Sequence, residues 1–138
     1  MSKLEKILRA RQKAGKTFRK IKMRCHLNAD ILYARIREEF DKVKDHRASN
    51  ASISLSDALM SAFAMFCLKD PSLLAFERRR QDDPDSLHEM FSIKNIPSDS
   101  QMRTILDPVS ARNLRRPFKV IFAQLQRGKV LEKMTWLA

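Results

Sequence analysis

The residues best placed to recognise a ligand lie between Ile96 and Asp107, in the sequence IPSDSQMRTILD. Ser98 or Asp99 can cap a helix here, because either side chain accepts hydrogen bonds from the free N–H groups of a first turn. Glutamine and arginine read base edges in DNA, and a recognition helix presents them on its first turns. The outward polar positions are Ser100, Gln101, Arg103 and Thr104. They predict a DNA-reading helix, and the same pattern also fits an ordinary capped surface helix.

A second set of candidate side chains forms a basic patch after Pro108. Ser110 is expected to cap a helix that runs through Arg127, with Gly128 in the position after its last turn. Pro117 lies inside this pattern, so either the helix kinks there or the first turn is separate and Pro117 stands near a new helix start. The basic residues are Arg112, Arg115, Arg116 and Lys119, and the apolar stripe is Leu114, Phe118, Ile121, Phe122 and Leu125. Such a basic face suits phosphate groups, and the caps and surrounding core favour a globular setting over a membrane-surface helix.

The first 26 residues form a basic arm that holds ten Lys and Arg against one Glu. Its second half alternates apolar and basic side chains, which fits a short strand, a helical turn or an arm that orders on binding. The basic residues of this alternation are Arg19, Lys20, Lys22 and Arg24. We predict that they contact phosphate groups; the alternative is a solvated tail whose charges keep the protein in solution.

Charge is distributed unevenly along the 138 residues, whose formal net charge is +12. Residues 27–102 hold ten basic and thirteen acidic side chains, whereas residues 103–138 hold eight basic and two acidic ones. A slightly acidic centre between basic ends is typical of a protein that binds a polyanion. The two cysteines have no close-spaced partners, and the N-terminus lacks the apolar segment of a signal peptide. These features indicate a cytoplasmic protein without a disulfide framework or a zinc module.

Other kinds of chemistry are less well supported. Arg78 to Arg80 are followed at once by acidic residues, so we expect them to complement a helix dipole and to form local ion pairs. The acidic residues from Asp82 to Glu89 are interpreted as a surface turn and not as a metal site. The histidines are scattered, Cys67 lies in an apolar helix expected to be buried, and two glycines cannot form a phosphate-binding loop. No catalytic residue is therefore assigned.

The element that must position these surfaces is the apolar stretch Leu55 to Leu68, which is hydrophobic on nearly every face and too short to cross a bilayer. Ser54 and Ser56 can cap its start, and Asp70 before a proline marks its end. Amphipathic or short apolar helices are expected from about Ala29 to His46 with Asn28 as N-cap, from Ser72 to Gln81, and over 87–93.

These elements predict an all-α protein: a compact multi-helix domain around a buried central helix, with a helix-turn-helix-like portion and a basic N-terminal arm. We expect the arm to cover residues 1–27 and a helical DNA-binding domain to cover residues 28–128. Residues 129–138 carry more apolar surface than a chain end usually does. They are interpreted as a tail that would lead into a further domain.

Three segments carry a resemblance to a known family: SLSDALMSAFAMFCLKDPSLLAFERRR, then IPSDSQMRTILD, then LRRPFKVIFAQLQRGKVLEKM. In order and spacing they resemble the N-terminal region of bacterial insertion-sequence transposases of the DDE type, which have an RNase H-like catalytic domain. The resemblance covers roughly Ser54 to Leu137. It implies an all-helical region that helps to bind the terminal inverted repeats of the element and to assemble the synaptic complex. The DNA-contacting residues it implies are Gln101, Arg103, Arg112, Arg115, Arg116 and Lys119.

The sequence departs from that family where the catalytic residues would begin. Such transposases hold two divalent metal ions with three acidic residues, the first on a strand soon after a segment like GKVLEKM. That acidic triad is absent here, so we expect no cofactor and no nuclease activity from this chain alone. The expected function is DNA binding by a truncated or split transposase, with double-stranded DNA as partner and a homodimer or a full-length transposase as a further one. The alternative is a helical interaction or dimerisation protein with non-specific nucleic-acid affinity.

Overall fold

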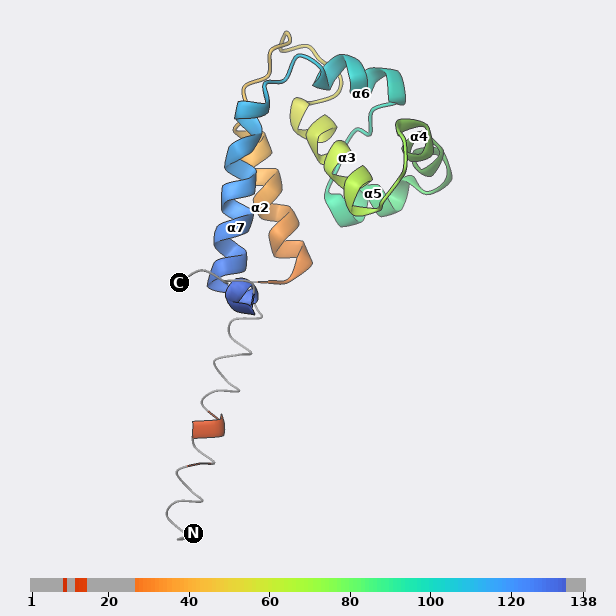
Figure 1. Ribbon diagram of the computed structural model, residues 1–138. Coiled ribbons are helices and arrows are strands. Elements are labelled where there is room, and N and C mark those ends of the chain that lie inside the picture. The colour runs from red at the N-terminus through yellow and green to blue at the C-terminus, as the bar shows by residue number, and fades with distance from the viewer. Residues whose placement is uncertain (1–8, 10–11, 15–26, 134–138) are drawn as a thin grey trace.

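A computed structural model describes residues 9, 12–14 and 27–133 of the chain (Figure 1). Its elements are α2 (Ala29–Asp41), α3 (Leu55–Cys67), α4 (Leu73–Asp82), α5 (Pro84–Phe91), α6 (Asp99–Leu106), η1 (Ala111–Leu114), α7 (Arg115–Arg127) and η2 (Val130–Lys133). No strand occurs among the described residues, which confirms the predicted all-α class. Within this part of the chain, no helix is both long and apolar enough to cross a bilayer.

The arrangement has two sides that meet at α2 and α3. Figure 1 shows α2 and α7 lying alongside each other on one side, with α3, α4, α5 and α6 on the other. Helix α2 packs on both α7 and α3, while α3 also packs on α5 and α6. The core is therefore centred on α3, as its apolar sequence predicts, and α2 joins that core to α7.

Helix α3 begins as expected but is not buried along its whole length. Ser54 is the N-cap, and its hydroxyl accepts the N–H of Asp57 at 3.0 Å. The helix is mostly buried from Leu55 to Ala64, whereas Phe66 is 74% exposed and Cys67 is exposed. The prediction that Cys67 is buried is therefore wrong. Neighbouring elements cover only part of the last turn of α3: Ala64 is buried, whereas Phe66 and Cys67 lie on its open side.

Helix α2 starts where the sequence predicts and ends earlier. Asn28 caps it by accepting the N–H of Asp30 at 2.7 Å, and Ile36 and Phe40 enter the core. The helix was expected to reach about His46, but it ends at Asp41. The next two N–H groups donate to carbonyls three residues earlier, which tightens the last turn and stops the α-helix.

Helices α4 and α5 follow their local signals closely. Ser72 caps α4 and Asp83 caps α5, with a proline at the first position of α5. Arg79 donates two hydrogen bonds of 2.8 Å to Asp70, and Arg80 is paired with Glu77. The interpretation of the arginine run as local ion pairs is confirmed for these two residues.

The C-terminal helix resolves the alternatives at Pro117 and corrects its cap. The first turn is the separate 3-10 helix η1, capped by Ser110, and Pro117 is the third residue of α7. Gly128 was expected in the position after the last turn, but it is the C-cap residue itself with φ −76°, and Lys129 follows it with φ +57°. A Cβ at Gly128 would lie 2.3 Å from Leu27 Cδ1, so any larger residue there would require the Leu27 side chain to move.

A buried ion pair between Arg37 and Asp57 ties α2, α3 and the segment after α5 together. Arg37 donates to Asp57 Oδ1 at 2.7 Å, and the two side chains are 18% and 2% exposed. The carboxylate also accepts the backbone N–H groups of Lys94 at 3.2 Å and Asn95 at 3.1 Å. Burial alone would raise the pKa of Asp57, but these hydrogen bonds and the Arg37 charge outweigh it and hold the pKa below its ordinary value.

We predict that Arg37→Gln lowers the free energy of unfolding by about 3 kcal/mol, because it leaves the Asp57 carboxylate buried without its counter-ion. Arg35→Gln is the matched control on the same helix, since Arg35 and Glu38 form an ion pair with both side chains about half exposed. Its cost should stay below about 0.5 kcal/mol. Urea unfolding followed by circular dichroism at pH 7 measures both values. Equal losses in the two variants would contradict a central role for the buried pair.

A second prediction concerns acid. Because the folded pKa of Asp57 is lowered, its ionised form adds stability that is complete above the unfolded value of about 3.9 and is lost as the pH falls through the folded value. The stability difference between the wild type and Asp57→Asn should therefore be constant near neutral pH and shrink below about pH 4. Urea titrations over this range test it, with a constant m value as the control for two-state unfolding. A difference that grows on acidification would contradict the assignment.

Candidate nucleic-acid interface

Four basic side chains line one face of η1 and the start of α7. Arg112, Arg115, Arg116 and Lys119 follow the spacing i, i+3, i+4 and i+7, which brings them to one side of the helix. All four are exposed. We call them the cationic face. Within the described part of the chain, the side chains of Arg112, Arg115 and Lys119 have no ion-pair partner.

Arg116 differs from the other three because it contacts a buried carboxylate. Its Nε lies 2.7 Å from Glu39 Oε2, while the rest of its side chain stays exposed. Lys42 donates to the other oxygen of Glu39. This hydrogen bond and the nearby Arg116 charge hold the pKa of Glu39 below its ordinary value. Glu39 therefore anchors one member of the cationic face to α2.

Sequence reasoning missed Glu39, although a signal was present. It lies three residues after Ile36 and just before Phe40, both of which are buried. That position places Glu39 on the inward side of α2, where a carboxylate needs a cationic partner. That partner is Arg116, one of the basic residues that the sequence predicts to contact DNA.

The electrostatic field around α7 is strongly positive. The segment 111–129 holds six Lys and Arg and no acidic residue. By contrast, Arg79 and Arg80 of α4 are paired with Asp70 and Glu77. The segment that includes α7 therefore carries a large local excess of positive charge, to which a polyanion would be attracted.

Gln101 and Arg103 lie on α6, and their side chains have partners within the same helix or its cap. Gln101 Oε1 accepts the N–H of Ser98 at 2.9 Å, and Ser98 Oγ accepts the N–H of Gln101, forming a capping box. Arg103 donates to Asp99 at 2.9 Å, which raises the pKa of its guanidinium. The predicted cap and outward positions of this helix are confirmed.

The N-terminus of α6 is also surrounded by carboxylates. The Asp99 N–H donates to Glu77 Oε2 at 3.2 Å, so α4 contributes an acid beside the first turn. Helix α6 packs on α3 and α4, on the other side of the domain from α7 (Figure 1). The structure thus brings Arg112, Arg115, Arg116 and Lys119 together and keeps Gln101 and Arg103 apart from them. Arg19, Lys20, Lys22 and Arg24 lie outside the described residues.

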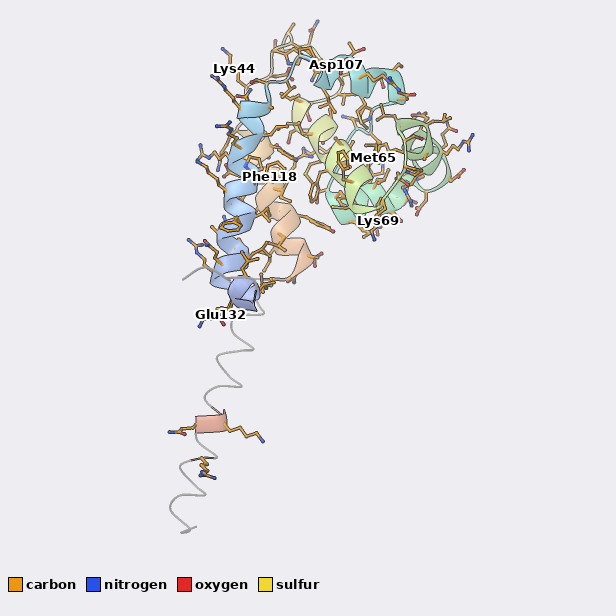
Figure 2. All side chains as sticks on the ribbon, viewed as in Figure 1. Lys44, Met65, Lys69, Asp107, Phe118 and Glu132 are labelled. Atoms are coloured by element: carbon orange, nitrogen blue, oxygen red, sulfur yellow. The ribbon has the colours of Figure 1, made fainter. Side chains whose placement is uncertain are left out.

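An apolar groove of about 330 Å³ runs between α2, α3 and α7. Its wall residues include Tyr33, Phe63 and Ile121, and two strongly exposed aromatic rings, Phe66 and Phe118, also line it. Figure 2 shows the side chains on the ribbon and labels Phe118 on α7. The sequence pattern did not predict this groove, because the same apolar spacing describes both a covered helix face and an uncovered one.

Two other kinds of site, a metal centre and a reactive thiol, find no support among the described residues. Among the described residues, no three His, Cys, Asp or Glu side chains gather in a way that could hold a metal ion. Partial desolvation raises the pKa of the Cys67 thiol, and a thiol with a raised pKa is a poor nucleophile near neutral pH. Neither observation adds a catalytic residue.

Comparison with protein-family models gives no match, and neither the curated proteins nor the solved structures that were compared give one. Among the described residues, the cationic face is the best-defined candidate surface for a ligand.

Proposed function

We propose that this chain is a DNA-binding module that contacts the phosphate backbone of double-stranded DNA through the cationic face. The observation that carries the proposal is the arrangement of Arg112, Arg115, Arg116 and Lys119 on one side of η1 and α7, three of them without a partner among the described residues. Lysine and arginine that neutralise phosphates release condensed counterions, which drives binding.

We further propose that the module belongs to a truncated or split transposase of the DDE type, and that its target is the terminal inverted repeats of the element. Support for this comes from the order and spacing of the resembling segments, and from exposed cations on the helix that holds one of them. Catalysis would then require a separate domain that supplies the acidic triad and its divalent metal ions. A full-length transposase or a second copy of this chain is the protein partner that such a module would need.

The cationic face is a better candidate for this contact than α6. A phosphate that approaches the N-terminus of α6 meets the carboxylates of Asp99 and Glu77, and Arg103 is already paired there. The face on α7 has no acidic residue along its segment. Gln101 Oε1 and Arg103 Nε are already used in hydrogen bonds that cap or stabilise their own helix, and the charge of Arg103 is offset by Asp99.

A second candidate function is self-association with non-specific nucleic-acid affinity. The apolar groove favours it, because a second copy of this chain offers the same groove and the same exposed rings of Phe66 and Phe118 in return. An apolar surface of this kind typically marks an interaction site. In this candidate, the cations provide only an electrostatic attraction to RNA, DNA or other polyanions.

We predict that Arg115→Gln and Lys119→Gln each reduce the salt dependence of duplex binding, lowering the slope of log K against log salt by about 0.9 per lost phosphate contact. Lys69→Gln is the matched control, because Lys69 is an exposed cation that follows α3 and lies away from α7 (Figure 2). Fluorescence anisotropy at several salt concentrations measures the slopes. Equal slopes for all three variants would remove the cationic face from the interface.

The two candidates differ in sequence preference. If the chain belongs to a transposase, its affinity for the ends of its own element should exceed that for random duplex by at least about 100-fold at physiological salt. Both affinities can be measured by competition against one labelled duplex. Equal affinity for every polyanion, lost steeply as salt rises, would favour the second candidate. Sedimentation of the protein alone would then show whether it self-associates.

A further inference from the structure

Two exposed phenylalanines alternate with two members of the cationic face along α7. Arg115, Phe118, Lys119 and Phe122 follow the spacing i, i+3, i+4 and i+7, so they share one strip of the helix surface. Phe118 is 76% exposed and Phe122 is 53% exposed. The strip therefore presents cation, ring, cation and ring in order. We call it the aromatic strip.

The rings of this strip have no use in binding a regular duplex through its backbone. In duplex DNA the flat faces of the bases are stacked on one another inside the helix, and phosphates and sugars line the outside. A phenylalanine ring offers no hydrogen bond to a phosphate. Duplex binding thus accounts for Arg115 and Lys119 but gives no role to Phe122 or to Phe118, whose ring also lines the apolar groove.

Unpaired bases provide what the rings lack. Every base has a flat face that can stack on an aromatic side chain, and such stacking is worth about 1–3 kcal/mol per base with little regard to sequence. The Cβ atoms of residues one helical turn apart lie about 5–6 Å from each other, so two neighbouring bases can each meet one ring. Arg115 and Lys119 are then next to the rings, where the phosphates of the same strand can reach them.

We propose that the aromatic strip binds single-stranded DNA, with Phe118 and Phe122 stacking on bases and Arg115 and Lys119 contacting phosphates. This inference rests on the proposed function and specifies the form of DNA that the α7 surface prefers. It predicts tighter binding of a single strand than of a duplex of the same length at the same salt concentration.

The test compares an unstructured thymine strand of about 16 nucleotides with its duplex by fluorescence anisotropy. Phe118→Leu/Phe122→Leu keeps an apolar side chain and a good helix former at both positions but removes the rings. We expect this double variant to bind the single strand at least about thirtyfold more weakly and the duplex within about twofold of the wild type, as loss of about 2 kcal/mol of stacking from two rings requires. Leu74→Ala is the control, because Leu74 is also a strongly exposed apolar side chain but lies on α4, on the other side of the domain from α7 (Figure 1).

Several outcomes would overturn the inference. If the duplex binds at least as tightly as the single strand and the double variant changes neither, the inference fails while the proposed DNA binding stands. If the double variant loses self-association and keeps single-strand binding, the rings belong to a protein interface and the inference fails. If the wild type binds neither form, the inference and the proposed function both fail. Circular dichroism of the double variant checks that a loss of binding does not come from unfolding.

Discussion

The buried ion pair between Arg37 and Asp57 is the constraint on which the remaining arrangement depends. A carboxylate that is almost fully buried requires a cation and hydrogen-bond donors, and here α2 supplies the cation while the segment after α5 supplies two backbone N–H groups. One side chain therefore fixes three parts of the chain relative to one another. Because α7 packs on α2 and not principally on α3, the pair also sets the position of α7.

The domain separates its charges by neutralising some and leaving others open. On α4 and α6, the basic side chains Arg79, Arg80 and Arg103 have carboxylate partners at short range. On α7, Arg115 and Lys119 have none among the described residues. The net charge of the sequence does not show which of these cations are paired and which are not. What the structure adds, for the described part of the chain, is the location of the densest group of unpaired cations, which lies on η1 and the first turns of α7.

The N-terminal caps, which depend on nearby residues, were predictable from the sequence, whereas the end of α2, the C-terminal cap of α7 and features fixed by distant residues were not. The caps at Asn28, Ser54 and Ser98 depend on the next two or three residues, and all three were predicted. The partner of Asp57 lies twenty residues away, and its backbone donors lie further still, so no local pattern identified them. The cationic spacing on α7 was visible in the sequence. The exposure of Cys67 and Phe66 was not, because it depends on which face of α3 other helices cover.

The close contact between Leu27 and Gly128 joins the two ends of the described domain. It places the point where residues 1–26 attach beside the last turn of α7, and Lys119 lies nine residues before Gly128, or about 13 Å along the helix axis. If the cationic face holds DNA as proposed, the ten basic residues of the arm are attached close to that DNA and are not free in solution. The arm would then meet the same DNA molecule at an effective concentration set by the length of chain that joins it to the domain. This can raise the overall avidity without any new contact within the domain.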